Sequence, residues 1–214
     1  MLCQGNPYGS CGANVNHFVT IISVGISTAF PHAVKRPFAI LFVIGLVSSA
    51  LQCATLEHLA LTDIIGKSTA IVRARVTGSS VAKIGPVIYT HYQLQVSEQY
   101  KGTAESSVDL AFPGGALGGI QQVYSGVPQL HSGEEYVFFL WTGKSGVTQV
   151  IGLTQGLFAV SYAGVKDPSL VRAASHETMI ERGTGRHVQD QTLTMTLSAL
   201  KSQISAVLGS QGSR

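Results

Sequence analysis

Apolar and polar side chains alternate along much of the chain after residue 68, which is the pattern of a β-strand with one buried face. In the stretch from Thr69 to Val76 every second residue is aliphatic, and Arg73 and Arg75 lie on the other face. Six stretches predict strands, at residues 69–76, 87–100, 108–112, 136–141, 147–151 and 157–162. The turn signal GKSG at 143–146 predicts that the fourth and fifth strands form a hairpin.

Two segments carry apolar residues at helical spacing instead. Thr55 to Lys67 begins with a threonine that can cap a helix, and Thr192 to Leu208 is followed by Gly209, a residue type that commonly ends one. Residues 78–85 and 163–191 are predicted to be connections. The pattern predicts a mainly β fold, a small antiparallel barrel with one N-terminal and one C-terminal helix. The predicted boundaries are 55–162 for the barrel, 163–191 for the loop and 192–209 for the helix packed on the barrel.

Residues 34–54 have the three parts of a secretory signal peptide. Two basic residues precede an apolar run from Pro37 to Leu51, and cleavage is expected after Ala54 or Ala50. The apolar run is shorter than the roughly 20 residues that span a bilayer, which favours cleavage over anchoring. The protein is therefore expected to be secreted or periplasmic and to meet the membrane only in transit.

Alternatives stay open for this leader. Residues 1–33 are interpreted as a disordered extension or as the result of a start site assigned too early, because initiation at Val34 gives a signal peptide of normal length. Anchoring through residues 37–51 is one alternative. Acylation of Cys53 is another, although Ala50-Leu51-Gln52 is a poor match to the small residue expected before a lipidated cysteine. An acylated chain would be an envelope lipoprotein with a structural role.

Charge and cysteine content change when the leader is set aside. The whole chain has a formal charge of +3, but two of its 14 basic residues and none of its 11 acidic residues precede Thr55. The near-neutral remainder gives no electrostatic footprint for nucleic acid. Cys3, Cys11 and Cys53 all lie in the leader, so the mature chain cannot form an internal disulfide. This favours a bacterial exported protein that is stable without such bonds.

Three short motifs point to a family. They are the strand Ser68–Val76, the run Tyr92–Val96 leading to Tyr100-Lys101-Gly102, and the segment Ser132–Phe138. In this order they resemble the netrin-like module, the OB-type barrel of the N-terminal domain of tissue inhibitors of metalloproteinases, over about residues 55–160. The chain is also similar to uncharacterised exported bacterial proteins with the same motifs.

The resemblance implies an OB-like antiparallel barrel and makes an exported protease the most specific partner to expect. The inhibitors chelate the protease zinc through a disulfide-held N-terminal cysteine. In this chain the only candidate is Cys53, and no other cysteine follows it. Inhibition by that mechanism is therefore not expected.

A glycine-rich excursion between the third and fourth predicted strands is the candidate binding surface. It lacks the lysine and hydroxyl of a phosphate loop, and a strand rather than a helix follows it. The glycines are interpreted as turn residues with positive φ, in a loop that is free to contact a partner. The expected partner-binding residues are Gly114, Gly115, Leu117, Ile120, Tyr124, Leu130 and His131.

No arrangement of residues in the sequence indicates catalysis, a metal or a cofactor. His131 adjoins Ser132 and His176 adjoins Glu177, but neither has the spacing of a hydrolase elbow or a metal site. The sequence therefore favours an exported, non-catalytic domain that binds a protein partner. The alternative is an extracytoplasmic hydrolase or metal enzyme, in which His131 or the residues from His176 to His187 would converge in one cleft.

Overall fold

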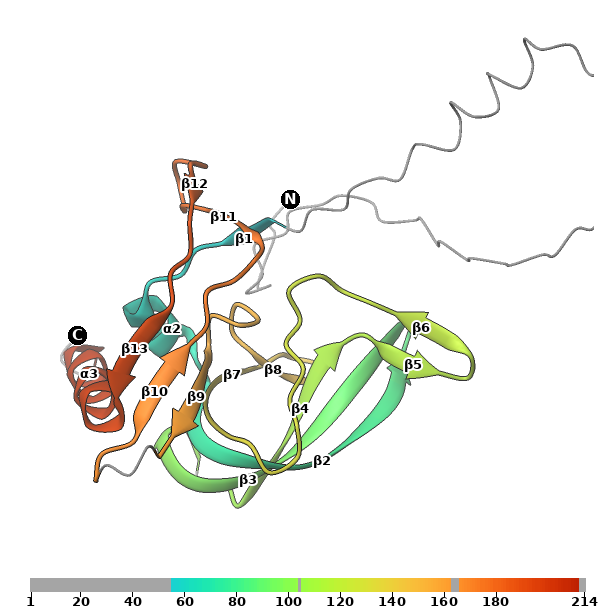
Figure 1. Cartoon of the computed structure of the whole chain (residues 1–214), viewed down its shortest axis with the longest axis horizontal. Helices are drawn as coiled ribbons and strands as arrows, with labels where there is room; N and C mark the ends of the chain where they lie inside the picture. The colour runs from blue at the N-terminus through green and yellow to red at the C-terminus, as the bar shows by residue number, and fades with distance from the viewer. Residues whose placement is uncertain (1–54, 104, 163–165, 212–214) are drawn as a thin grey trace, which may run out of the picture. The chain divides into compact units, whose positions relative to one another are not determined.

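The computed structural model describes residues 55–103, 105–162 and 166–211 (Figure 1). The predicted signal peptide, the extension before it and Cys53 lie outside these ranges. None of the helices within the described residues is long and apolar enough to cross a membrane.

An eight-stranded antiparallel sheet forms the body of the protein. Its strands follow the order β13-β10-β9-β7-β2-β3-β4, and β8 pairs with β7 beside this path. Their bounds are β2 Ala70–Ile84, β3 Val87–Lys101, β4 Ser107–Pro113, β7 Glu135–Thr142, β8 Thr148–Val150, β9 Leu157–Ser161, β10 Ser169–Arg172 and β13 Leu193–Thr196. The predicted mainly β, antiparallel class is confirmed. Among the described strands no pairing joins β4 to β13, so the sheet is open rather than a closed barrel.

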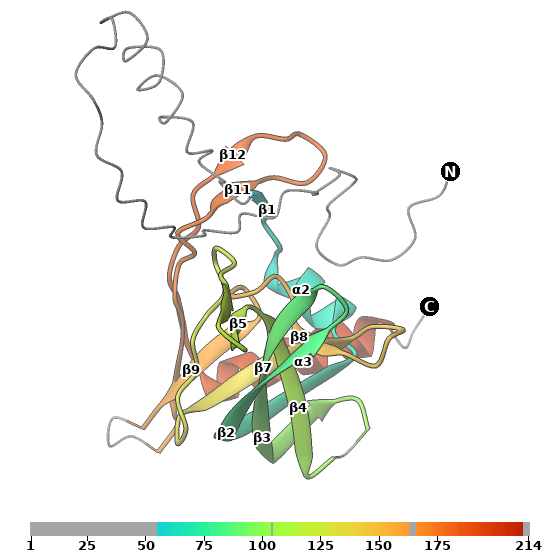
Figure 2. The same ribbon diagram turned by 90° about the vertical axis from the view of Figure 1, so that its right-hand side faces the viewer.

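The hairpin of β2 and β3 is longer than the sequence predicts. Residues 78–85 were expected to connect two strands, but β2 continues to Ile84 and pairs with β3 as far as Val87. The register shifts between Val76 and Gly78, which marks a β-bulge that absorbs the irregular residue. Figure 2 shows the long strands β2 and β3 running side by side with β4.

Two apolar clusters stabilise the sheet from its opposite faces. One packs under the two helices and includes Ile71, Phe139 and Phe158. The other lies within the curve of β2, β3, β4 and β7 and includes Val72 and Phe138. Adjacent residues of β2 and of β7 therefore enter different clusters, because helices cover one face of the sheet where β4 and its neighbours curl over the other.

Both helices begin later than predicted. Helix α2 spans Leu61–Lys67, and the segment Thr55–Glu57 is strand β1, which pairs in parallel with β11. Helix α3 spans Leu197–Gln211, so Gly209 lies inside it and does not end it. In both cases a short strand precedes the helix, and its apolar residues fall at positions that also fit the helical spacing. Pairing with a distant strand decides the outcome, and no local signal in the sequence reports it.

The segment 163–191 is not simply a loop. It contains β10, β11 (Thr178–Ile180) and β12 (His187–Val188), and β1, β11 and β12 form a small separate sheet. β10 joins the main sheet between β9 and β13. The predicted boundary between barrel and loop at residue 162 is therefore wrong, because the main sheet continues through β10 and β13.

Helix α3 is tied to the sheet by one ion pair that makes stability depend on pH. Lys201 Nζ lies 2.5 Å from Glu98 Oε1, and the Tyr100 hydroxyl donates to the same carboxylate at 2.9 Å. Burial raises the pKa of Glu98, but the hydrogen bonds from Lys201 and Tyr100 outweigh it and lower the pKa below its ordinary value of 4.5. A carboxyl with a lowered pKa stabilises the fold above its unfolded pKa, and this contribution is lost as the pH falls through the folded pKa.

We therefore expect Lys201→Met to lower the free energy of unfolding at neutral pH by about 1 kcal/mol or less, since both side chains are more than a third exposed. The difference from the unchanged protein should shrink as the pH falls below 4.5. Urea unfolding of both proteins at neutral and at acid pH measures it. A difference that stays constant with pH would show that the lost contact is not electrostatic.

Candidate functional site

The glycine-rich excursion folds into a short hairpin. β5 (Gly115–Leu117) pairs with β6 (Ile120–Gln122), and Gly118 and Gly119 form the two-residue turn. Their φ angles are 59° and 78°, so both occupy the left-handed region that a tight hairpin turn of this type requires. The predicted role of these glycines as turn residues is confirmed.

This hairpin is fixed to the end of the β2–β3 hairpin (Figure 1). The Gln122 side chain accepts a hydrogen bond from the Ile88 amide at 2.6 Å and donates one to the Pro86 carbonyl at 3.1 Å. The Gly114 amide donates to the Ile88 carbonyl at 2.7 Å. At Gly115 a side chain would come within 2.9 Å of Thr90 Oγ1, so the absence of a side chain permits the close approach.

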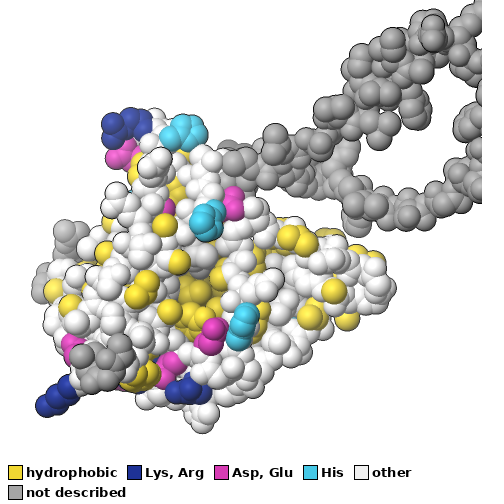
Figure 3. Space-filling view, viewed as in Figure 1, with side chains coloured by type: hydrophobic (Ala, Val, Ile, Leu, Met, Phe, Trp, Pro, Cys, Tyr) yellow, Lys and Arg dark blue, Asp and Glu magenta, His cyan; other side chains and the backbone are white. Residues whose placement is uncertain are grey.

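Exposed apolar side chains gather where these two hairpins meet. Six large hydrophobic side chains are exposed in the described chain, and only Tyr162 lies elsewhere. The other five, which we call the apolar end, are Ile84, Leu117, Ile120, Val123 and Tyr124. No Asp, Glu, Lys or Arg occurs between Leu110 and Ser132. On the face shown in Figure 3, the region of β5 and β6 accordingly carries hydrophobic and uncharged polar atoms.

Six of the seven predicted binding residues fall into three groups. Leu117, Ile120 and Tyr124 are exposed as expected, with Ile120 at 56%. Gly114 and Gly115 position the hairpin and present no side chain. His131 is exposed and lies in the turn before β7, where its amide donates to Glu134 Oε2 at 2.8 Å.

Leu130 contradicts the prediction that the excursion presents it to a partner. Its side chain is only 7% exposed and belongs to the cluster within the curve of β2, β3, β4 and β7. After Val127 the chain turns back toward the sheet, and the Leu130 amide approaches the Tyr92 hydroxyl at 3.5 Å. Sequence reasoning also missed Ile84 and Val123. Ile84 was assigned to a connection, although its place beside Gly85-Pro86 marks it as a hairpin-tip residue.

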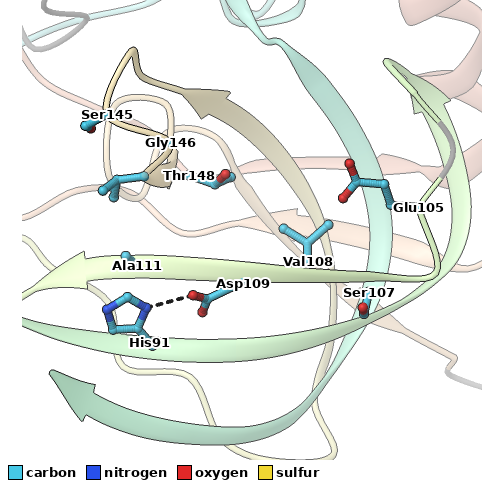
Figure 4. Close-up of a pocket in the computed structure, with 10 residues that line it drawn as sticks. His91, Glu105, Ser107, Val108, Asp109, Ala111, Ser145, Gly146 and Thr148 are labelled. Carbon is cyan, nitrogen blue, oxygen red and sulfur yellow. Dashed lines mark hydrogen bonds and ion pairs between the residues drawn. The ribbon is translucent and has the colours of Figure 1, made fainter.

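A polar pocket of about 270 Å³ lies between β4 and the turn that joins β7 to β8 (Figure 4). His91 on β3 and Asp109 on β4 stand side by side there, with His91 Nδ1 2.9 Å from Asp109 Oδ2. Ser145 in the turn and Thr148 at the start of β8 also line the pocket. This pair was not among the predicted site residues. The signal for it is the antiparallel pairing of strands 87–100 and 108–112, which places both residues on the same face of the sheet.

The His91–Asp109 pair resembles the base half of a catalytic triad, but its geometry does not activate a nucleophile. In such a triad the second ring nitrogen receives the proton of a serine or cysteine. Here His91 Nε2 is buried and has no hydrogen-bond partner among the described residues. Among the described residues, no hydroxyl or thiol at that nitrogen makes the nucleophile contact of such a triad.

The histidines of the alternative enzyme reading can also be placed. Within the described residues, no group of three or more His, Cys, Asp or Glu side chains is placed so that it could hold a metal ion. His187 lies on β12, His131 in the turn before β7, and His176 between β10 and β11. His91, which the prediction did not name, is the histidine that lines the polar pocket.

A charged network covers the outer face of β2 and β7. Glu135, 7% exposed, accepts from Arg73 Nε at 2.5 Å, from Arg75 Nη2 at 2.9 Å and from the Tyr162 hydroxyl at 3.0 Å. Arg73 also donates to the Tyr162 hydroxyl and lies over its ring. The two arginines neutralise a nearly buried carboxylate, and Tyr162 stays at the surface because its hydroxyl belongs to the same network.

Comparison of the chain with protein-family models, with curated proteins and with solved structures found no match in any of the three.

Proposed function

We propose that this chain is an exported, non-catalytic domain that binds a protein partner through the apolar end. The observation that carries the proposal is the clustering of Ile84, Leu117, Ile120, Val123 and Tyr124, five of the six exposed large hydrophobic side chains of the described residues. A cluster of exposed apolar side chains marks an interaction site, whereas single exposed hydrophobic residues are ordinary.

Rigidity adds to the argument. The hydrogen bonds of Gln122 and Gly114 hold the β5–β6 hairpin on the β2–β3 hairpin, so its exposed side chains need little ordering on binding. Full burial of an aliphatic side chain contributes roughly 1.5 to 3 kcal/mol, and Val123 is still 80% exposed. A partner that covers the apolar end therefore gains from several side chains at once.

Export is part of the proposal because of the predicted signal peptide at residues 34–54. The resemblance to the netrin-like module makes exported proteases the first heterologous partners to test. The absence of charge between Leu110 and Ser132 supports a partner whose contact surface is apolar and uncharged.

Site-specific photo-crosslinking tests the proposal. A photoreactive amino acid at Val123 should crosslink the exported protein to a partner, and Ile120→Lys should reduce this crosslink about ten-fold, because a partner would have to desolvate the added charge. Gln203→Lys, on the exposed face of α3, adds the same charge elsewhere and should leave the crosslink unchanged. Equal crosslinking by the Ile120→Lys protein and the unchanged protein would remove the apolar end as the binding surface.

A further inference from the structure

The outer edge of β6 is open. β5 and β6 form a two-stranded sheet, and within the described ranges no third strand pairs with β6. In an antiparallel pair, hydrogen-bonded and non-hydrogen-bonded residue pairs alternate. The two-residue turn makes Leu117 and Ile120 the first hydrogen-bonded pair, so Gln121, opposite Ala116, directs its N–H and C=O toward the open edge.

This edge lacks the features that keep natural edge strands apart. Open edges are usually blocked by a charged side chain, a proline or a covering segment. β6 consists of Ile120, Gln121 and Gln122, and it contains neither a charge nor a proline. Its two flanking residues, Gly119 and Val123, are also uncharged and exposed.

The surface around the edge is complementary to itself. In a two-fold symmetric contact the same patch lies on both sides, so any charge in it faces a like charge. The excursion has no Asp, Glu, Lys or Arg from Leu110 to Ser132. The charged side chains beside it are Lys83, next to Ile84 in β2, and Glu177, whose carboxylate accepts a hydrogen bond from Ser125. Two copies can therefore meet here without opposing charges along the excursion.

We propose that the partner of the apolar end is a second copy of this chain. The two β6 strands pair antiparallel about a two-fold axis at Gln121, whose N–H and C=O exchange two hydrogen bonds with Gln121 of the second copy. The result is a four-stranded sheet in the order β5-β6-β6-β5, flanked by the exposed side chains of Ile120 and Val123 from both copies. The inference rests on the proposed function, since it names the partner of the same surface.

Backbone chemistry gives the sharpest test. Gln121→Pro removes the outward N–H but keeps every apolar side chain, and proline is tolerated where an edge strand's N–H faces solvent. Sedimentation velocity of the exported protein over a range of concentrations should show a monomer–dimer equilibrium. We expect Gln121→Pro to raise the dimer Kd about ten-fold or more and Gln121→Ala to change it little. A protein that stays monomeric throughout, or equal effects of the two substitutions, would overturn the proposal.

A second variant keeps the test decisive if the proline distorts the hairpin. Residues of a hydrogen-bonded antiparallel pair have Cα atoms about 5.5 Å apart, a separation that a disulfide can bridge. With Cys3, Cys11 and Cys53 changed to serine, Gln121→Cys should form a disulfide-linked dimer on mild oxidation, and Gln203→Cys on α3 should not. Equal yields from the two positions would mean random collision.

The outcomes separate this inference from the proposed function. A monomeric protein whose Ile120-dependent crosslink goes to a different protein overturns the self-pairing and keeps the function. A dimer that depends on Gln121, with no crosslink to any other protein, keeps the self-pairing and shows that the apolar end serves assembly. A monomer without an Ile120-dependent crosslink overturns both.

Discussion

Replacing Asp190 with alanine is expected to lower the free energy of unfolding by about 3 to 5 kcal/mol, because it leaves a buried arginine without its counter-charge. Arg172 is 7% exposed, and its Nη2 lies 2.7 Å from Asp190 Oδ1, in a side chain that is 1% exposed. The other carboxylate oxygen accepts the Ser175 amide at 2.8 Å. Alanine therefore removes the acceptor of a buried charge and of a backbone amide together. Urea unfolding monitored by circular dichroism measures the loss.

An exposed pair provides the matched control. Arg186 and Glu181 form an ion pair on the β11–β12 hairpin, with Arg186 75% exposed, and Glu181→Ala should lower the free energy of unfolding far less than Asp190→Ala does. The double change Arg172→Met with Asp190→Leu should recover much of the stability that Asp190→Ala loses, because neither partner then leaves a charge unpaired. A double variant as unstable as the single one would argue that packing at these positions, rather than the unpaired charge, sets the cost.

Asp190 lies at the end of the segment that the sequence described least well. The predicted strands 87–100 and 108–112 alternate clearly, and 136–141 is an almost continuous apolar run. Each is confirmed as the main part of a strand. β11 and β12 have only three and two residues, too few for a period to show. Their partners are β1, more than a hundred residues away, and each other. Such strands exist because of non-local pairing, which single-sequence patterns do not contain.

The exposure of a candidate binding residue could be predicted from the sequence where a local feature, such as a tight turn, causes it. Glycines at 118 and 119 form the tight turn, and a turn places Leu117 and Ile120 at a tip, where they are exposed. The burial of the Leu130 side chain depends instead on the path of the chain after Val127. That path returns the residue to the cluster containing Tyr92, which only the tertiary structure reveals.

The motifs that carry the family resemblance have structural roles in this chain. Lys101 Nζ donates to the carbonyls of Ile65 and Gly66, each at 2.9 Å, and so satisfies the end of α2. Gly102 has a φ of 95° and leaves no space for a side chain, since one would approach the Thr69 carbonyl oxygen at 2.9 Å. These contacts explain, without reference to a partner, why Lys101 ends β3 and Gly102 follows it. They bear on folding and leave the netrin-like resemblance as a prediction.

The buried side chain of Gln155 holds the segment that follows the predicted cleavage site. Replacing Gln155 is therefore the second substitution that we expect to destabilise the fold strongly. Gln155 is 1% exposed. Its Oε1 accepts the Leu59 amide at 2.8 Å, and its Nε2 donates to the Glu57 carbonyl at 2.9 Å. The side chain thus acts as a strand partner on one edge of the segment, while β11 pairs with the other edge.

Gln155→Leu should therefore lower the free energy of unfolding by about 2 to 5 kcal/mol, because it leaves the buried Leu59 amide and the partly buried Glu57 carbonyl unpaired. A fully buried group left unpaired costs about 1 to 3 kcal/mol, and a partly buried one costs less. The neighbouring Thr154 is the matched control, because its buried hydroxyl has no partner among the described residues, and Thr154→Val should be neutral or slightly stabilising. Limited proteolysis adds a local readout. If Gln155 fastens the N-terminal segment, cleavage near residues 55–60 should accelerate in Gln155→Leu before the rest of the chain is attacked. Uniform cleavage throughout the chain would show instead that Gln155 supports the fold as a whole.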